Sequence, residues 1–106
     1  MEAALKALAE PNRRRILTLV RNDELTAGEI ASHFDVSRPA VSQHLTVLKE
    51  AGLVHERRNG TRRLYSVRPE GFDDVKTFLE SFWDVRLEAL KREAEREERR
   101  KRGKHD

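Results

Sequence analysis

The sequence predicts a mainly α-helical domain that carries one small β-hairpin, and three observations support this α+β class. Apolar residues recur at helical spacing along most of the chain. Residues 37–52 begin with a serine and end with a glycine, which are typical start and stop signals of a helix. Asn59-Gly60 lies between two short strand-like segments, as in a hairpin. We expect five helices and a two-stranded hairpin.

Size and composition limit the function. The chain has 106 residues, enough for one small domain with a single core. It contains no cysteine, which excludes disulfides, thiolate metal sites and a cysteine nucleophile. No apolar run approaches the roughly 20 residues needed to cross a bilayer, and the N-terminus lacks the order of a signal peptide. The expected compartment is the cytoplasm.

The first three helices follow from local signals. Residues 2–9 are helix-prone, and Pro11 suits the first position of a second helix that runs to about residue 21. Thr26 and Glu29 have the spacing of a capping box, in which each side chain satisfies the other residue's backbone amide. A short third helix should therefore begin there.

The fourth helix is the most clearly marked. Ser37 is a typical N-terminal cap, and Gly52 suits the left-handed conformation that ends a helix. Between them, Val41, Leu45 and Leu48 follow one another at spacings of four and three, which predicts one buried stripe. Two short helices joined by a tight turn form a helix-turn-helix.

Two elements complete the chain. Residues 54–58 and 61–67 are the expected strands, joined by a type I′ turn at Asn59-Gly60. A long helix with a broad apolar face begins near Phe72. We expect a folded domain over residues 1–94 and a charged tail over residues 95–106, inside which the helix should fray.

Charge is unevenly distributed, although the net charge is only +3. Residues 37–68 hold seven Lys or Arg against two Glu, whereas residues 23–35 hold four acidic residues and no Lys or Arg. Residues 69–90 are also acidic, with six acids against two basic residues. A basic segment between acidic ones suits docking on a polyanion such as DNA, although ordinary solvated charge gives the same composition.

The exposed side of the fourth helix carries groups that can read DNA. Arg38 can hold guanine with two hydrogen bonds, and Gln43 can pair with adenine. Ser37 and Ser42 suit phosphate oxygens or base edges, and Ser37 can also serve as a cap. His44 lies either at the edge of this face or half-buried at a helix junction. The expected DNA-contacting set on this helix is Ser37, Arg38, Pro39, Ser42, Gln43 and His44.

Four arginines surround the expected hairpin turn: Arg57, Arg58, Arg62 and Arg63. Like charges so close together repel one another unless an anion lies between them, and a phosphate backbone or a narrow minor groove is the natural partner. Residues 13–15 form a third arginine cluster, for which an outside partner and local acidic pairing are equally plausible.

No constellation for catalysis or metal binding is present. His33, His44 and His55 stand eleven residues apart on different elements, and no histidine pair has a ligand spacing. Nothing resembles a glycine-rich phosphate loop or a serine-histidine-acid arrangement. We therefore expect no enzyme, no cofactor and no metal.

The segments LAEPNRRRILTLV and LTAGEIASHFDVSRPAVSQHLTVLKEAGLVHERRNGTRRLYSV resemble the ArsR-type winged helix-turn-helix regulators, over about Leu5 to Leu90. The resemblance implies a homodimeric, cytoplasmic (nucleoid-associated) prokaryotic repressor that binds a palindromic operator. It places DNA contacts on the fourth helix and on the hairpin, called the wing. It places the dimer interface on Leu5, Leu8, Phe78, Phe82, Trp83, Leu87 and Leu90.

The chain departs from the metal-sensing members of that family. They carry a cysteine pair near the start of the helix-turn-helix, where residues 25–30 have none, and others use a histidine of the last helix, where residues 72–102 have none. The resemblance is therefore to a branch without metal-binding residues. The alternatives are a winged-helix protein-interaction module and a metal-responsive repressor with a non-standard site.

Overall fold

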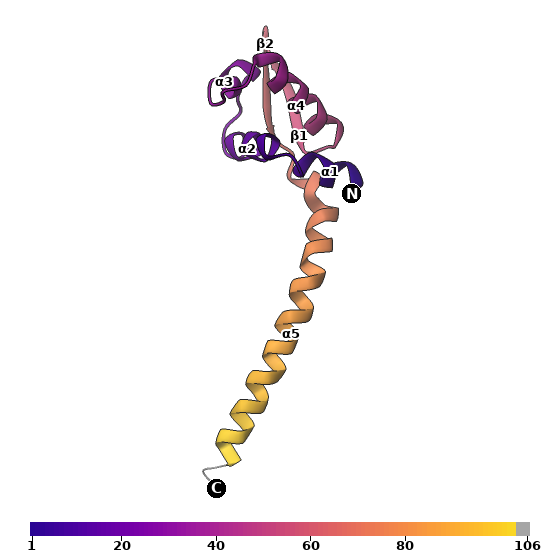
Figure 1. Cartoon of the computed structure of the whole chain (residues 1–106), viewed down its shortest axis with the longest axis vertical. Helices are drawn as coiled ribbons and strands as arrows, with labels where there is room; N and C mark the ends of the chain where they lie inside the picture. The colour runs from indigo at the N-terminus through magenta and orange to yellow at the C-terminus, as the bar shows by residue number, and fades with distance from the viewer. Residues whose placement is uncertain (104–106) are drawn as a thin grey trace. The chain divides into compact units, whose positions relative to one another are not determined.

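The computed structural model describes residues 1–103, without the side chains of residues 84–87, 102 and 103. It divides into two compact units, residues 1–75 and 76–106. The predicted fold class is confirmed, with five helices and a two-stranded antiparallel hairpin in the described residues (Figure 1). The elements are α1 (Glu2–Leu8), α2 (Pro11–Leu19), α3 (Ala27–Ala31), α4 (Arg38–Glu50), β1 (Val54–Asn59), β2 (Arg62–Val67), the 3-10 helix η1 (Pro69–Phe72) and α5 (Asp73–Gly103).

The predicted capping signals form as expected. The Thr26 hydroxyl accepts from the Glu29 amide at 3.1 Å, and the Glu29 carboxylate accepts from the Thr26 amide at 3.2 Å. The Ser37 hydroxyl accepts from the Ala40 amide at 3.3 Å and so caps α4. Gly52 follows α4 with a φ of 76°, the left-handed conformation predicted for it. These local signals explain why α3 begins at Ala27 and why α4 begins at Arg38 and ends at Glu50.

The core of residues 1–75 is drawn from α1 to α4, from β1 and from Val75, with residues of β2 and η1 packed against it. The predicted stripe of α4 is buried, because Val41, Leu45 and Leu48 are at most 1% exposed. The largest other fully buried side chains are Ile16, Val20, Ile30 and Leu53. Leu5 and Leu8 of α1 are half-buried against this core, beside the buried Ala4 and Ala7.

The hairpin turn lies one residue later than predicted. Asn59 pairs with Arg62, so the two loop residues are Gly60 and Thr61 rather than Asn59 and Gly60. Only Gly60 has a positive φ, at 66°, whereas a type I′ turn needs a positive φ at both loop residues. The type I′ prediction was therefore wrong: one glycine at the first loop position is the type II′ pattern.

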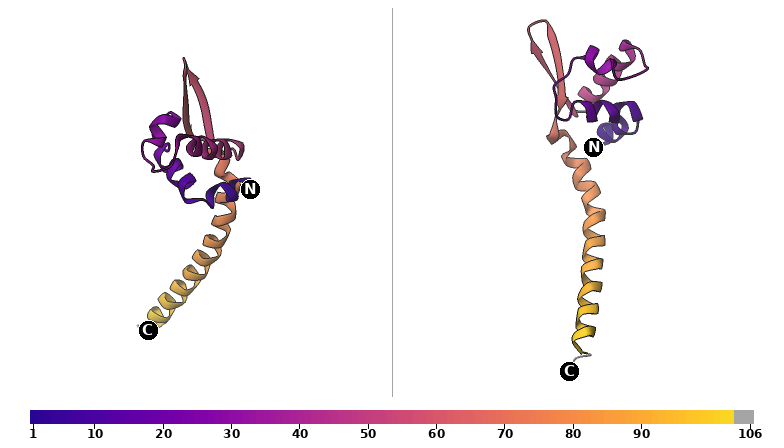
Figure 2. Two further views of the ribbon diagram at one scale, coloured as in Figure 1. Left: turned by 45° about the horizontal axis from the view of Figure 1, so that its top comes forward. Right: turned by 90° about the vertical axis from the view of Figure 1, so that its left-hand side faces the viewer.

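A backbone bridge joins the hairpin to the helix-turn-helix. The Leu25 amide donates to the Tyr65 carbonyl at 3.1 Å, and the Tyr65 amide donates to the Leu25 carbonyl at 2.8 Å. Two residues further along, at the C-terminal end of β2, the Val67 amide donates to the Val20 carbonyl at 3.3 Å. Figure 2 shows the hairpin standing against the helical group and extending past it.

Two glycines meet where the chain leaves the hairpin. A Cβ at Gly71 would stand 1.8 Å from the Gly52 carbonyl oxygen, so the η1 backbone and the end of α4 are in direct contact. Arg68 reinforces this crossing, because its amide donates to the Leu53 carbonyl at 2.9 Å.

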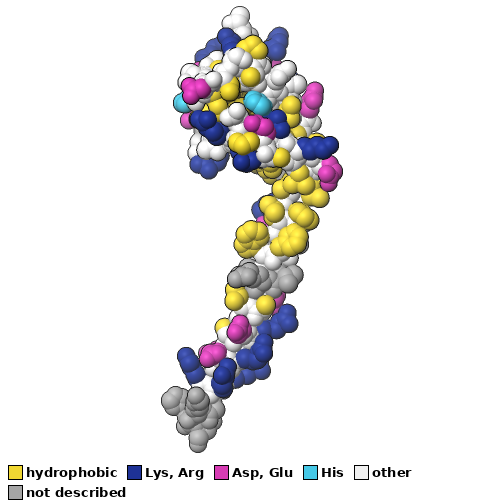
Figure 3. Space-filling model, in the orientation of Figure 1, with side chains coloured by type: hydrophobic (Ala, Val, Ile, Leu, Met, Phe, Trp, Pro, Cys, Tyr) yellow, Lys and Arg dark blue, Asp and Glu magenta, His cyan; other side chains and the backbone are white. Residues whose placement is uncertain are grey.

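Helix α5 is regular from Asp73 to Gly103. The prediction that the helix frays inside the charged tail was therefore wrong for residues 95–103. This stretch is rich in helix-favouring Glu, Arg and Lys, and Arg100 pairs with Glu97 at 3.2 Å. The first half of the same helix exposes Phe78, Phe82 and Trp83, and Figure 3 shows apolar side chains gathered there. No helix among the described residues is both long and apolar enough to cross a membrane.

Candidate nucleic-acid interface

Helix α4 divides into a buried face and an exposed face. Because its apolar stripe is held in the core, the opposite side presents Arg38, Pro39, Ser42 and Gln43, all exposed. In the described part of the chain, the side chains of Ser42 and Gln43 make no hydrogen bond, so their polar groups are available to a partner. The Thr46 hydroxyl is occupied, since it donates to the Ser42 carbonyl at 3.0 Å.

Arg38 lies at the first position of α4, above the start of α3. Its guanidinium carbon is 3.8 Å from where a Cβ at Gly28 would stand. The Arg38 guanidinium thus lies within ordinary contact distance of position 28. Arg38 makes no hydrogen bond or ion pair with the described residues, so its charge is free to meet an anion.

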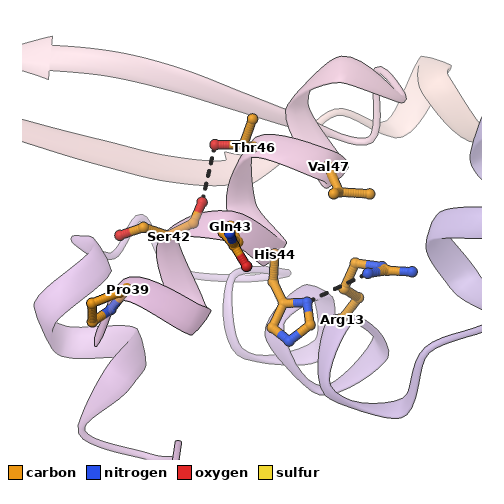
Figure 4. Close-up of a pocket in the computed structure, with 7 residues that line it drawn as sticks. All are labelled: Arg13, Pro39, Ser42, Gln43, His44, Thr46 and Val47. Carbon is orange, nitrogen blue, oxygen red and sulfur yellow. Dashed lines mark hydrogen bonds between the residues drawn. The ribbon is translucent and has the colours of Figure 1, made fainter. Parts of the chain in front are cut away.

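His44 occupies the junction between α2 and α4. Its side chain is 19% exposed, and its Nδ1 accepts from the Arg13 guanidinium at 3.4 Å. Its Nε2 lies 3.9 Å from the Glu10 carboxylate. Figure 4 shows His44 turned toward Arg13. Of the two readings left open by the sequence, this is the half-buried one, although the ring still lines a groove beside Ser42 and Gln43.

The arginine cluster at residues 13–15 has an internal role that the sequence analysis did not foresee. Arg13 donates to the Ala7 carbonyl at 2.7 Å and Arg14 donates to the Leu8 carbonyl at 2.8 Å. Cations at the end of a helix satisfy its last carbonyls and its dipole. Arg15 stacks on Phe34, with 4.4 Å from its guanidinium carbon to the ring centre. The cluster thus binds the end of α1 and the turn after α3.

The wing has two faces with different surroundings. Directly opposed residues of an antiparallel pair share a face, and the pairs Glu56–Tyr65 and Arg58–Arg63 alternate with Arg57–Leu64. Tyr65 packs on the core and Glu56 pairs with Lys49 of α4 at 2.9 Å, so their face is turned toward α4. Arg58 and Arg63 therefore lie on the α4 side, and Arg57 lies on the other side.

Three of the four wing arginines have internal carboxylate partners. Arg57 donates two hydrogen bonds to Glu24, at 2.9 and 2.8 Å, and Arg62 donates to Glu29 at 2.9 Å. Arg63 approaches Glu56 at the longer distance of 3.6 Å. Arg58 has no ion pair within the described residues. The mutual repulsion expected from the sequence is therefore relieved in part from within the protein.

The pKa values of the acidic partners report these contacts. The hydrogen bond from Arg57 lowers the pKa of Glu24, and that from Lys49 lowers the pKa of Glu56. Hydrogen bonds from the Thr26 amide and hydroxyl lower the pKa of Glu29, with a smaller effect from Arg62. Burial raises the pKa of Tyr65, which lies beside Glu56. All three glutamates are therefore ionised at neutral pH.

A groove of about 370 Å³ lies between α4 and the wing. Three arginines from two elements reach it, with hydroxyl groups between them. Such a lining suits an anion such as a phosphate group, because guanidinium groups and hydroxyls donate hydrogen bonds to phosphate oxygens. The lining residues are Thr26, Ala27, Arg38, Ser42, Thr61, Arg62, Arg63 and Tyr65.

No metal-binding cluster of His, Cys, Asp or Glu occurs among the described residues. His33 follows α3, His44 is in α4, and His55 is in β1, where it lies 3.7 Å from Glu70. His105 lies outside the described residues. The donor set and its dispersal therefore do not fit a metal site in this part of the chain.

The predicted dimer residues of α5 are exposed where they are described. Phe78 is 43% exposed, Phe82 59%, Trp83 62% and Leu90 50%, and Leu79, which was not predicted, is 46% exposed. The Phe78 and Phe82 rings meet edge to face, with 5.1 Å between their centres. The Leu87 side chain lies outside the described part of the helix.

Known proteins are similar to this chain in sequence and in fold. Residues 10–56 match the arsR family of bacterial regulatory proteins. The chain is 48% identical over 82 residues to the HTH-type transcriptional regulator Rv2034 of Mycobacterium tuberculosis, covering 77% of each. It is 37% identical to the transcriptional repressor SdpR of Bacillus subtilis, covering 77% of this chain and 91% of SdpR. The solved homodimeric winged helix-turn-helix DNA-binding domain of Mb0332 from Mycobacterium bovis is 31% identical, covers 78% of this chain and 77% of that one, and superposes with a TM-score of 0.63.

Proposed function

This chain belongs to the ArsR family of bacterial transcriptional regulators, and from that membership we propose that it is a homodimeric repressor that binds a palindromic DNA operator. Members of the family are regulators rather than enzymes. Repression is proposed because SdpR is named a repressor. The proposed place of action is the bacterial nucleoid in the cytoplasm.

The observation that carries the proposal is the common direction of two basic features. The exposed face of α4 and Arg63 of the wing border two grooves that both contain Ser42 and Tyr65, and Arg58 lies directly opposite Arg63 in the hairpin. A helix that enters the major groove uses residues of its N-terminal half to meet base edges, and a neighbouring hairpin can follow the backbone. Here those two parts lie side by side and carry the same charge.

We assign the reading of bases to α4. Arg38 and Gln43 have exposed, unoccupied donors that suit guanine and adenine edges. Ser42 and the backbone near Ser37 and Pro39 suit phosphate oxygens. His44 supports this helix through Arg13 and can meet DNA only at the edge of the face, since its ring is largely covered.

We assign phosphate contact to the wing, with Arg58 and Arg63 in the leading role. They are directly opposed, so their charges repel, and the Glu56 carboxylate near Arg63 is shared with Lys49. A phosphate between the two guanidinium groups would relieve this repulsion. Arg57 and Arg62 belong to the same wing but already hold carboxylates.

A two-fold dimer would place two copies of α4 in successive major grooves, about 34 Å apart. The proposed occupant of the exposed apolar face of α5 is a second copy of this chain, as supported by the homodimeric relative Mb0332. Trp83→Glu should convert a dimer into a monomer in sedimentation-velocity runs, whereas Thr77→Glu on the same helix should leave it dimeric. A wild-type protein that sediments as a monomer at micromolar concentration would contradict this assembly.

The decisive experiment is the recovery of genomic DNA fragments by the purified protein, followed by binding titrations on the recovered site. Arg38→Ala should weaken binding by about 1–3 kcal/mol at one or two base positions and relax the preference there. Arg63→Ala should weaken binding on all sequences and reduce the slope of log K against log salt by about 0.9.

Arg21→Ala is the matched control. Arg21 is exposed and directly follows Val20, whose carbonyl accepts from the Val67 amide at the end of β2 away from the hairpin turn. The substitution removes one positive charge away from the proposed face and should leave both properties unchanged. If the wild type recovers no DNA, or if all three variants bind like it, the chain is instead a protein-interaction module.

A further inference from the structure

Two acidic residues of the helix-turn-helix hold two of the wing arginines. Glu24 precedes α3 and pairs with Arg57 of β1, and Glu29 of α3 pairs with Arg62 of β2. Between them in sequence, Leu25 forms its backbone bridge to Tyr65. We call these three contacts the wing clamp.

We propose that the wing clamp withholds Arg57 and Arg62 from DNA, so that the wing meets the phosphate backbone through Arg58 and Arg63. Glu24 and Glu29 act as positioning residues in this proposal, which rests on the proposed DNA-binding function. Their role is to limit the number of phosphate contacts and hence the strength of binding to DNA of any sequence.

The geometry supports an unequal use of the four arginines. The Glu24–Arg57 pair is bidentate, which fixes the guanidinium plane as well as its distance. The register places Arg57 opposite Leu64, on the side of the hairpin turned away from α4. Leu64 is only 7% exposed, although it lies outside the main core cluster. A rotation of Arg57 toward DNA would break both hydrogen bonds and leave the face it shares with Leu64.

Arg58 and Arg63 are in a different position. Arg58 has no ion pair within the described residues. Arg62 and Arg63 both line the groove that contains Arg38 and Ser42, but Arg62 is held by Glu29 at 2.9 Å, whereas Arg63 approaches Glu56 only at 3.6 Å. The depressed pKa of Glu24 and the raised pKa of Arg57 agree with a pair that stays charged and bound at neutral pH.

Limiting phosphate contacts has a consequence for a regulator. Each phosphate contact strengthens binding to every DNA sequence, and a genome offers millions of competing sites. An acidic segment beside a basic wing therefore lowers background binding without altering the residues proposed to read bases. This accounts for the juxtaposition of an acidic segment at residues 23–35 with the basic segment that follows it.

The test compares Glu24→Gln with Asp23→Asn, using fluorescence anisotropy of a labelled random-sequence duplex over a salt series. Both variants add one unit of net charge at neighbouring exposed positions, but only Glu24→Gln releases an arginine. Glu24→Gln should steepen the slope of log K against log salt by about 0.9 relative to Asp23→Asn. A fourfold rise in salt would then weaken its binding by a further factor of about 3.5.

Two more variants test whether the change in salt slope comes from Arg57 itself. Adding Arg57→Ala to Glu24→Gln should restore the wild-type slope, whereas Arg57→Ala alone should leave that slope unchanged. Glu24→Asp keeps the net charge but shortens the side chain, so any steepening it causes comes from the released arginine and not from the overall field. Circular dichroism on each variant shows whether it is folded. If Glu24→Gln does not fold, Glu24→Asp replaces it as the variant that releases Arg57.

Equal slopes for Glu24→Gln and Asp23→Asn would overturn the proposal, as would a loss of slope in Arg57→Ala equal to that in Arg58→Ala. Neither result would affect the proposed function, because a sequence-specific dimeric repressor does not need Arg57 to be held by Glu24. The proposed function would instead be refuted by a wild type that binds neither this duplex nor any genomic fragment.

Discussion

Replacing Gly71 by alanine should destabilise the folded domain more than any other glycine-to-alanine change in residues 1–75. A Cβ at this position would stand 1.8 Å from the Gly52 carbonyl oxygen and 2.8 Å from its carbonyl carbon. Real Cβ atoms do not approach closer than 3.0 Å, so the two backbones must separate by more than about 1 Å. The obstacle is backbone at the end of a helix, which cannot turn aside as a side chain would.

The magnitude follows from the contacts that this separation would break. The Arg68–Leu53 backbone hydrogen bond, at 2.9 Å, lies next to the crossing and would be lost or lengthened. Overpacking costs about 1–3 kcal/mol and a broken hydrogen bond about 1 kcal/mol, so we expect a loss of roughly 2–4 kcal/mol. For a chain of this size, each kcal/mol lowers Tm by roughly 4 °C.

Two other glycines are internal controls. Gly60→Ala meets nothing within 4 Å but sits at a φ of 66°, so only the left-handed strain of about 1 kcal/mol applies. Gly28 lies within α3, and a Cβ there would meet only Arg38 and Thr26 at ordinary contact distances, so Gly28→Ala should stabilise the fold by about 0.5–1 kcal/mol. Thermal unfolding followed by circular dichroism at one fixed protein concentration should therefore rank Tm as Gly28→Ala above wild type, then Gly60→Ala, then Gly71→Ala. A Gly71→Ala protein with the wild-type Tm would refute the contact.

Three further changes test the packing, the cap and the ion pairs. Leu48→Ala removes a fully buried side chain from α4, so urea titration should show a loss of about 2–5 kcal/mol. Ser37→Ala removes the cap of α4 and should cost about 1 kcal/mol in the same titration, against less than about 0.5 for the exposed Ser42→Ala. The pKa values of Glu24 and Glu56 are lowered by folding, so their stabilisation is complete above the unfolded glutamate pKa of about 4.3 and is lost as pH falls through the folded pKa. The urea concentration at the unfolding midpoint should therefore decrease as the pH is lowered from 6 to 3. An increase would show that these pairs do not favour the folded state.

Short-range signals in the sequence were sufficient to predict the helices. The capping box at Thr26 and the Ser37 cap depend on residues three apart, and the stripe of α4 depends on spacings of three and four. Such patterns describe interactions that close within one or two helical turns. The structure therefore confirms them almost residue by residue.

Features that depend on distant residues escaped prediction. The hairpin turn moved by one residue because the register of the strands puts Asn59 opposite Arg62 and leaves Gly60 and Thr61 in the loop. Glu24 and Glu29 are each 33 residues before the wing arginine that they hold, and Glu56 lies on the opposite strand from Arg63. The Leu25–Tyr65 bridge spans forty residues. The only signal in the sequence was the complementary charge of residues 23–35 and 37–68.

The partners of the arginines at residues 13–15 were also missed from the sequence. A run of three cations suggested a partner outside the chain or a nearby acid. Backbone carbonyl groups at the end of a neighbouring helix were not considered, because every residue has one and composition does not reveal which are unpaired. In the fold, two of them satisfy that helix end and the third lies on an aromatic ring.

The bridge between Leu25 and Tyr65 also bears on how this protein can be taken apart and rebuilt. The hairpin is continuous in sequence, from Val54 to Val67, and would be the obvious piece to exchange between related regulators. Its third strand, however, is a single residue supplied from before α3. A hairpin transplanted alone would be separated from Leu25 and from its carboxylate partners Glu24 and Glu29 unless residues 24–29 travelled with it. The transferable part is therefore a discontinuous one, made of two separate stretches of chain.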